Sequence, residues 1–217
     1  MHRRQNAFTV VEMVLAMAIT AMIGLSVAGV AVALSTAQAD QEESYQYAQT
    51  ARSAINRIQG YLSRARLVTA RGDGSLVYWI KDADGDGTIS LEELGEIRRH
   101  SEDRTLRLHR VVFPDNMDEQ VHAALNAQVE LDCAADMASA TQLIETNGRH
   151  VDQVEAEDVE AFDVAAYPEC PVAKLVSIHL VIGQGERQVA LRSAVALRAD
   201  CTDEVAVSEG AYVLNGP

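Results

Sequence analysis

The chain has 217 residues, a formal net charge of -14 and 48% hydrophobic residues, enough to build one buried core. The acidic balance argues against a nucleic-acid-binding protein, because such proteins meet phosphate with lysine and arginine. We therefore expect no nucleic acid among its partners.

The N-terminus combines a short basic leader with a long apolar segment. An acid, Glu12, stands at the start of this segment, and no other charged residue follows until Asp40. Residues 10–34 have the length of a membrane-spanning helix, which needs about 20 residues. The basic leader predicts that the N-terminal end stays in the cytoplasm. An ionised side chain in hydrocarbon costs roughly 2.5 kcal/mol or more, so Glu12 must be neutralised or paired.

The helical pattern continues beyond the apolar segment. No proline or glycine lies between Ser35 and Gln59, and apolar residues recur at alternating three- and four-residue spacing. The residues in this stripe are Ala48, Ala51, Ile55, Ile58, Leu62 and Ala65. The pattern predicts one long helix over residues 8–66, with its second half lying on a head formed by residues 67–217.

Two other interpretations of the N-terminus stay open at this point. A cleaved secretory signal could end at Ala37-Gln38-Ala39, where small residues resemble a signal-peptidase site. The segment could also be an ordinary signal anchor in which Glu12 has no function.

Residues 82–93, which read DADGDGTISLEE, match the calcium-binding loop of an EF-hand. The spacing predicts these oxygen ligands: Asp82, Asp84, Asp86, the carbonyl of Thr88, Ser90 through a water, and both carboxylate oxygens of Glu93. Gly87 would permit the sharp turn, and Ile89 would point back into the fold. Hard oxygen ligands in a flexible loop favour Ca²⁺ over Mg²⁺. The alternative is an Asp/Gly-rich turn whose carboxylates are simply solvated.

The segments around the loop differ from those of an EF-hand. Ser75–Ile80 is rich in β-branched and aromatic residues and predicts a strand where an EF-hand has a helix. Leu91–Leu94 predicts a helical turn, and Glu96–His100 and Thr105–Val112 predict two further strands. A single calcium loop between strands would act as a structural staple and not as a conformational switch.

The rest of the chain predicts a mixture of helices and strands. Glu119–Asn126 and Ala134–Glu145 fit short helices, and Val154–Val164 fits a strand. Ala173–Ile182 and Arg187–Arg198 fit a hairpin joined by a glycine-containing turn. The predicted fold class is α+β, with a long N-terminal helix packed on an antiparallel β-sheet head.

The hairpin also suggests a disulfide. If Ile182 faces Arg187, Cys170 lies opposite residues 198–200, and Cys201 follows at once. We therefore predict a Cys170–Cys201 bond, which an oxidising compartment would permit. Pairing of Cys133 with either of these cysteines remains open.

The basic leader, Phe8, Glu12 and the apolar run together resemble the N-terminus of type IV prepilins and type II secretion pseudopilins. The resemblance implies a pilin-like fold and a leader, residues 1–7, that prepilin peptidase cleaves between Ala7 and Phe8 before the new amine is methylated. The family usually has glycine before the cut, so Ala7 is a departure. In the family the acid serves filament assembly, which implies that Glu12 pairs with the Phe8 amine of a neighbouring subunit.

A long helix followed by a Leu-Val-Tyr-Trp strand and a basic hairpin resembles the J-type minor pseudopilin of type II secretion, or the similar W-type minor pilin. This resemblance implies a single-pass protein of the inner membrane with its head in the periplasm. It also implies that the partners are other pilin or pseudopilin subunits, with which the chain enters a filament.

No catalytic constellation is visible. The histidines are scattered, and no Gly-x-Ser-x-Gly motif is present. His109 and His179 alternate with apolar residues, so both are expected on solvated faces. We expect a non-enzyme. The alternative to a filament subunit is a membrane-anchored, calcium-dependent adhesin or binding module.

Overall fold

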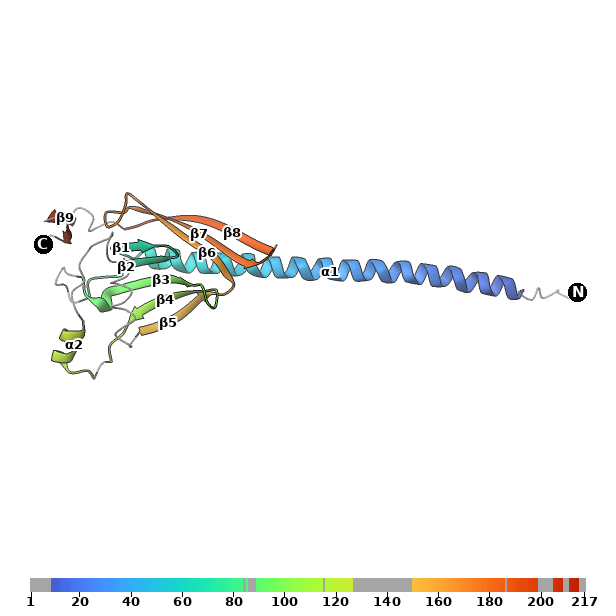
Figure 1. Cartoon of the computed structure of the whole chain (residues 1–217), viewed down its shortest axis with the longest axis horizontal. Helices are drawn as coiled ribbons and strands as arrows, with labels where there is room; N and C mark the ends of the chain where they lie inside the picture. The colour runs from blue at the N-terminus through green and yellow to red at the C-terminus, as the bar shows by residue number, and fades with distance from the viewer. Residues whose placement is uncertain are drawn as a thin grey trace, which may run out of the picture. The chain divides into compact units, whose positions relative to one another are not determined.

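The computed structural model describes residues 9–83, 85, 89–114, 116–126, 150–185, 187–198, 205–208 and 211–214. Its helices are α1 (Val10–Leu62), the 3-10 turn η1 (Leu91–Glu93) and α2 (Glu119–Leu125) (Figure 1). Its strands are β1 (Leu67–Gly72), β2 (Ser75–Trp79), β3 (Leu94–His100), β4 (Thr105–Val111), β5 (His150–Ala156), β6 (Val159–Tyr167), β7 (Leu175–Gln184), β8 (Arg187–Ala196), β9 (Val205–Ser208) and β10 (Ala211–Leu214). The chain divides into two compact units, Met1–Tyr45 and Gln46–Pro217.

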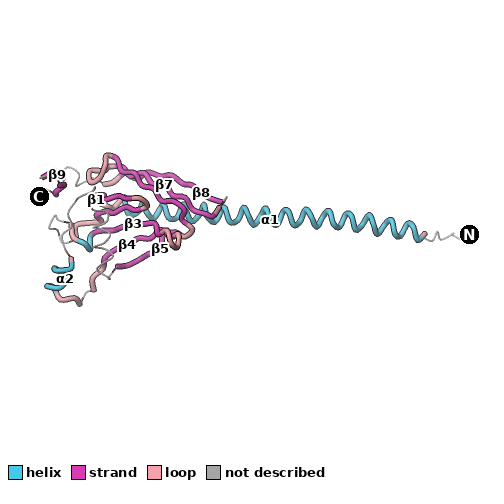
Figure 2. The backbone as a smooth tube through the Cα atoms, viewed as in Figure 1, coloured by secondary structure: helices cyan, strands magenta, loops and turns pink. Residues whose placement is uncertain are grey.

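The second unit contains the end of α1 together with all of the strands (Figure 2). One face of this part of the helix is buried, as the spacing of its apolar residues predicts. The buried helical residues are Ala51, Ala54, Ile55, Ile58 and Leu62. The helix ends at Leu62, short of the predicted residue 66. The reason is that the Arg66 N–H donates to the Trp79 carbonyl at 2.9 Å and so already belongs to the sheet.

Five antiparallel strands form the larger sheet, in the order β1-β2-β3-β4-β5. The strands predicted on both sides of the acidic loop are confirmed, and so is the helical turn at η1. β1 was not predicted. It pairs with β2 through a tight turn that places Gly74 at a φ of 73°, a left-handed conformation that suits glycine.

The smaller sheet has the order β6-β7-β8, and β9 pairs with β10 in a separate hairpin. β7 alternates as predicted, with Val176, Ile178, Leu180 and Ile182 all buried. The register of the β7–β8 hairpin differs from the expectation that Ile182 faces Arg187. Ile182 pairs with Val189, because the strands continue until Gln184 pairs with Arg187.

The prediction of one strand over Val154–Val164 is wrong. β5 ends at Ala156 and β6 begins at Val159, so the chain passes from one sheet to the other between them. Asp158 takes a left-handed φ of 56°, which aspartate tolerates better than most residues. The Val159 N–H then donates to the Arg104 carbonyl at 2.7 Å, which fixes the corner against the β3–β4 turn.

The helix predicted at Glu119–Asn126 is confirmed as α2. Asp118 caps it by accepting the N–H groups of Gln120 and Val121 at 3.0 and 3.3 Å. The second predicted helix, Ala134–Glu145, lies outside the described residues.

The predicted α+β fold class is confirmed, because the end of α1, the five-stranded sheet and the three-stranded sheet share one hydrophobic core. A polar contact fixes the helix within this core. The Glu155 side chain on β5 is fully buried and pairs with Arg57 of α1, Nε to Oε2, at 2.7 Å. The Tyr61 hydroxyl donates to the other oxygen at 2.8 Å. Burial and this hydrogen bond raise the pKa of Tyr61, so the phenol remains a neutral donor.

Close packing between β2 and β3 requires a glycine. Tyr78 lies directly across from Gly95 in the sheet. A Cβ atom on Gly95 would lie 2.7 Å from Cζ of the tyrosine ring. Burial raises the pKa of Tyr78 to about 12, consistent with a neutral phenol in the core. The ring therefore occupies the space that any side chain at position 95 would need.

We expect Gly95→Ala to lower the free energy of unfolding by about 1–3 kcal/mol, because the buried Tyr78 ring must shift. Urea unfolding of the full chain in detergent, followed by the fluorescence of Trp79, measures this. Trp79 is the only tryptophan. Gly60→Ala in α1 is the control. A Cβ atom at position 60 would meet no neighbour within 4 Å, so this change should be neutral or stabilising by up to about 1 kcal/mol. Equal midpoints for Gly95→Ala and the parent would contradict the packing argument.

Candidate functional site

The first candidate site is the acidic loop between β2 and η1. The structure describes its two ends, including Asp82, Ser90 and Glu93. The predicted ligands Asp84, Asp86 and Thr88 lie outside the described residues.

Glu93, the last predicted ligand, organises the loop from inside the protein. It is 2% exposed. Its Oε2 accepts the Trp79 indole N–H at 3.0 Å and the Ser90 backbone N–H at 3.3 Å, and its Oε1 accepts the Ala83 backbone N–H. One carboxylate thus joins the end of β2, the beginning of the loop and its end. The sequence predicted that Glu93 closes the loop but not that the closure uses these N–H donors.

Asp82, the first predicted ligand, holds the other end. Its Oδ1 accepts the Gly85 N–H at 2.7 Å, a turn that folds the loop back on its first residue. Its Oδ2 pairs with Nη1 of Arg66 at 3.1 Å. The Arg66 guanidinium also lies 4.5 Å from the centre of the Trp79 ring. Trp79 therefore contacts Glu93 directly and Asp82 through its partner Arg66.

The two ends fit an oxygen-lined cation site in several respects. Ile89 is 2% exposed and so points inward as predicted. Oε1 of Glu93 accepts one hydrogen bond and so keeps a second lone pair that can bind a cation, whereas Oε2 already accepts two. Within the described ranges no group of three or more His, Cys, Asp or Glu side chains converges on one point. The calcium assignment stays a prediction, since its central ligands lie outside those ranges.

Contacts beyond η1 connect the loop to α2. The Glu92 N–H donates to Oδ1 of Asn126 at 3.0 Å, and the Glu92 carboxylate lies 3.1 Å from Nε2 of His122. The rings of His122 and Phe113 pack in a T-shaped arrangement, with their centres 4.8 Å apart. The sequence offered no signal for these contacts, because they join residues about thirty positions apart.

The second candidate site is the start of α1. Thr9 and Glu12 form a capping box, in which each residue satisfies a backbone N–H of the other. The Glu12 Oε2 accepts the Thr9 N–H at 2.9 Å and its hydroxyl at 3.0 Å, and the Thr9 Oγ1 accepts the Glu12 N–H at 3.3 Å. The predicted cleavage residues, Ala7 and Phe8, lie outside the described part of the chain. The sequence analysis missed this local role of Glu12, although the Thr-x-x-Glu spacing is its usual signal.

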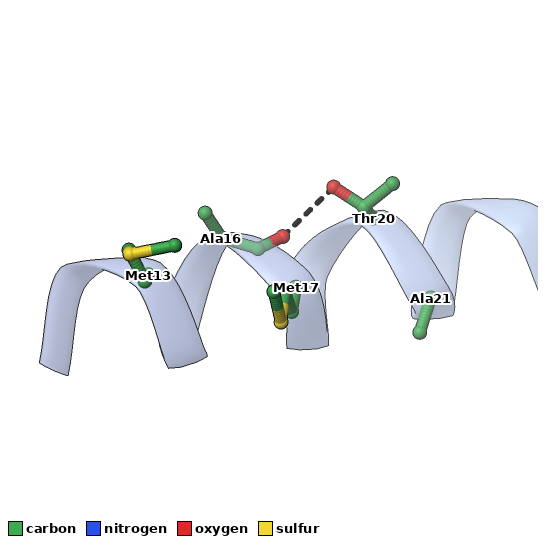
Figure 3. Close-up of a pocket in the computed structure, with 5 residues that line it drawn as sticks. All are labelled: Met13, Ala16, Met17, Thr20 and Ala21. Carbon is green, nitrogen blue, oxygen red and sulfur yellow. Dashed lines mark hydrogen bonds between the residues drawn. The ribbon is translucent and has the colours of Figure 1, made fainter. Parts of the chain in front are cut away.

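The first part of α1 is long and apolar enough to cross a membrane. From Val10 to Leu34 every side chain is exposed in the isolated chain. The hydroxyl groups in this part bond within the helix. Thr20 donates to the Ala16 carbonyl at 2.8 Å, beside Met13 and Met17 (Figure 3), and Ser26 donates to Met22 at 2.9 Å. Such bonds satisfy polar groups where no water is present, as hydrocarbon requires.

Two sequence predictions for histidines meet different outcomes. His109, expected on a solvated face, is only 5% exposed, so that prediction is wrong. The reason is tertiary, because the ring packs against the His100 ring and lies beside Asp152. His179 is partly exposed and lies 3.1 Å from Asp163, its neighbour on β6.

The observed β7–β8 register shifts the pairing by two residues but keeps the argument used for the disulfide, because counting on from Leu175 opposite Ala196 leads from position 170 to position 201. Cys170 is buried in the loop between β6 and β7 and not on a strand. Its proposed partner, Cys201, and the alternative, Cys133, lie outside the described residues. The Cys170–Cys201 bond stays a prediction.

Comparison with known proteins adds no relative. No family model matches the sequence, and no curated protein matches it. The residues and the geometry above are therefore the basis for a functional assignment.

We expect Glu93→Ala to lower the free energy of unfolding by roughly 2–4 kcal/mol even without calcium, because three N–H groups lose their acceptor. Urea unfolding in the presence of a calcium chelator measures this term alone. Glu102→Ala, an exposed acid in the β3–β4 turn, is the matched control and should change stability by less than about 0.5 kcal/mol. If both variants unfold at the same urea concentration, Glu93 is not an anchor of the loop.

Proposed function

We propose that the chain is a minor pilin or pseudopilin subunit of a type II secretion or type IV pilus-like filament, with a structural, non-catalytic role in assembly. The observation that carries the proposal is the division of α1 into two parts. Its first part is exposed, mostly apolar and without a charged residue between Glu12 and Asp40, and its last part buries one face in the head. A helix of this kind suits a subunit that is held in the inner membrane and later packs by its helix among other subunits.

The apolar part of α1 supports both stages of this proposal. Its length matches a bilayer core, and its hydroxyls are satisfied internally. With the basic leader on the cytoplasmic side, the head lies in the periplasm. The same exposed surface is available to neighbouring subunits after the chain leaves the bilayer.

Glu12 is the residue that we assign to assembly. After prepilin peptidase cuts between Ala7 and Phe8, the amine of Phe8 on one subunit pairs with Glu12 of its neighbour. In this contact each charge neutralises the other, so neither remains unpaired in an apolar environment. The contact therefore favours the register between subunits in which the pair can form.

The head keeps its shape with the help of Ca²⁺ in this proposal. The ion binds Asp82, Asp84, Asp86, the Thr88 carbonyl, Ser90 through water, and Glu93. Hydrogen bonds of Asp82 and Glu93 already fix the two ends of the loop beside Trp79. The ion would add the contacts that fix the middle of the loop. Because the loop joins strands, the ion stiffens the head and does not move one element past another.

We expect Ca²⁺ to raise the unfolding free energy of the full chain by about 2.7 kcal/mol at a hundredfold excess over its dissociation constant, and to change the fluorescence of Trp79. Asp84→Asn should weaken this response by removing a charged ligand. Asp73→Asn, in the turn between β1 and β2, is the control and should respond like the parent. An unchanged melting temperature in Ca²⁺ and in chelator would contradict the calcium assignment without affecting the filament assignment.

Processing of the leader tests the filament assignment. Co-expression with a prepilin peptidase should shorten the chain by residues 1–7, visible as a mobility shift on an immunoblot. Phe8→Asp, which changes the residue after the cut, should block the shift. A wild-type band that stays level with the Phe8→Asp band would contradict the proposal and favour a signal anchor that keeps its leader.

Three substitutions separate the two roles of Glu12 in the processed protein. Glu12→Ala removes the charge and the helix cap, Glu12→Gln keeps the cap without the charge, and Thr9→Ala weakens the cap without removing the charge. If pairing drives assembly, both Glu12 variants stay out of filaments and Thr9→Ala enters them. If all three variants reach the surface and bind in a calcium-dependent way as the parent does, and no filament forms, the result would favour the membrane-anchored calcium-dependent adhesin.

A further inference from the structure

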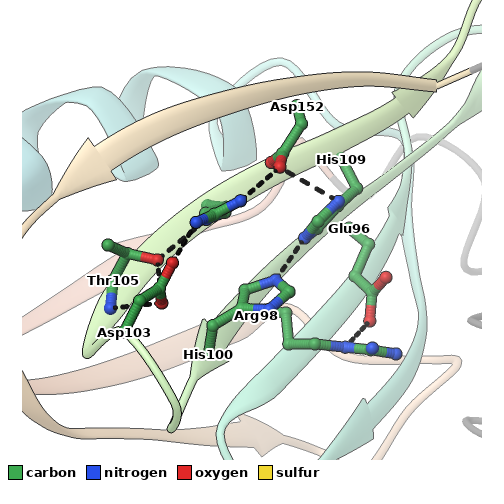
Figure 4. A network of polar contacts seen from close by, with 8 residues as sticks. Glu96, Arg98, His100, Asp103, Thr105, His109 and Asp152 are labelled. Atoms are coloured by element: carbon green, nitrogen blue, oxygen red, sulfur yellow. Dashed lines mark hydrogen bonds and ion pairs between the residues drawn. The ribbon is translucent and has the colours of Figure 1, made fainter.

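Two histidines from neighbouring strands point their rings at each other on the outer face of the larger sheet (Figure 4). His100 is the last residue of β3, and His109 lies in β4. Their Nε2 atoms are 2.8 Å apart, and the ring centres are 5.0 Å apart. His109 is buried, whereas His100 is partly exposed. Two ring nitrogens therefore converge at a point that solvent can approach from one side.

An acid lies beside one of the two rings. A carboxylate oxygen of Asp152, the partner of His109 in the sheet, lies 3.6 Å from Nδ1 of that ring. A negative charge on this side favours a proton on Nδ1 and leaves Nε2 of His109 with its lone pair. Metal-binding histidines commonly donate this second ring N–H to a carboxylate, and Asp152 stands on the corresponding side of His109 at an ion-pair distance.

One arginine on each of the two strands lies between the histidines, and each of these arginines forms an ion pair with an acid. Arg98 lies across from Arg107 in the register. Nε of Arg98 donates to Glu96 at 2.9 Å, and Nη1 of Arg107 donates to Asp152 at 2.6 Å. Arg107 also contacts Asp103. These ion pairs reduce the positive charge that a cation would meet between the rings.

The geometry points to a two-histidine binding site for a borderline transition-metal ion, Zn²⁺ or Cu²⁺, formed by Nε2 of His100 and Nε2 of His109. Imidazole nitrogen suits these ions, whereas Ca²⁺ and Mg²⁺ take oxygen ligands. The site is therefore separate from the acidic loop in both place and chemistry.

The distance between the two nitrogens is close to that required by the ion. Zinc–nitrogen bonds of about 2.0–2.1 Å in a tetrahedral arrangement place two ligand nitrogens about 3.3 Å apart. The rings need to separate by only about 0.5 Å from the observed contact. Antiparallel neighbours in the middle of a five-stranded sheet keep their backbones in place while the side chains make this adjustment.

When both rings are neutral, metal binding moves a proton within one ring and releases none to solvent. With the proton of His109 on Nδ1, facing Asp152, the hydrogen in the Nε2–Nε2 contact of the metal-free pair is assigned to His100. On binding, this hydrogen leaves Nε2 of His100 and Nδ1 of the same ring gains one, so both Nε2 lone pairs face the ion. A protonated ring cannot bind, so affinity falls as the pH is lowered. Since no third His, Cys, Asp or Glu side chain joins the pair in the described ranges, water completes the coordination.

Titration calorimetry of the full chain in detergent with Zn²⁺, in excess Ca²⁺ to occupy the acidic loop, tests the site. We expect one zinc-binding event that His100→Ala weakens at least tenfold and that Asp152→Asn weakens by about tenfold or more. His179→Ala, which removes a histidine beside an acid on another sheet, is the matched control and should bind like the parent. With Cu²⁺, electron paramagnetic resonance should show nitrogen coupling that His100→Ala alters and His179→Ala does not.

Thermal unfolding in chelator shows whether each variant is folded before metal is added. Zn²⁺ should raise the melting temperature of the parent and of His179→Ala but not that of folded His100→Ala. Equal zinc affinity for the parent and His100→Ala, or no zinc binding by the parent, would mean that the two rings form a hydrogen bond only, and would overturn the proposal. Neither result depends on filament assembly.

Discussion

The burial of Glu155 under α1 is the constraint on which the head depends. An apolar stripe alone would allow the helix to slide or rotate by small steps at modest cost. The ion pair between Arg57 and Glu155, in contrast, forms at one register of the helix on the sheet. A shift of one turn, about 5.4 Å, would take Arg57 and Tyr61 out of reach of Glu155. It would leave a fully buried carboxylate without its partners, which is among the most destabilising changes in a protein interior. The apolar stripe therefore supplies the burial, and Glu155 sets the register of the helix on both sheets.

The acidic loop shows how a calcium-type sequence can close between strands. In an EF-hand the entering helix positions the first ligand. Here a strand precedes the loop, and its last residue, Trp79, takes that part by donating to Glu93 and by contacting Arg66, the partner of Asp82. Glu93 is held by N–H groups from three different positions, so the loop has a fixed exit whatever occupies its centre. This explains why a motif that normally belongs to helix pairs is compatible with a sheet.

Features that repeat along the chain could be predicted from the sequence, and features that depend on distant contacts could not. The helical stripe and the alternation in β7 are confirmed because periodicity directly reports which face is buried. β1 escaped prediction because Leu67, Val68, Thr69 and Ala70 are all buried, which leaves no alternation to detect. In the candidate sites, two sequence motifs drew attention to Asp82, Glu93 and Glu12. The contacts of the two loop acids with Arg66 and Trp79, and the burial of His109, could not be predicted, because they depend on residues far apart in the sequence.

The helix-capping role of Glu12 is compatible with its proposed role in assembly, because the two contacts can use different carboxylate oxygens. Both contacts from Thr9 end on Oε2, and no described hydrogen bond ends on Oε1. An ammonium group from another subunit can therefore approach Oε1 while the helix cap remains intact. The cap also restricts the rotamers of the acid before a partner arrives, so less side-chain entropy is lost when the pair forms. In the proposed filament, the capping box would thus prepare the carboxylate for its partner and would not compete with it.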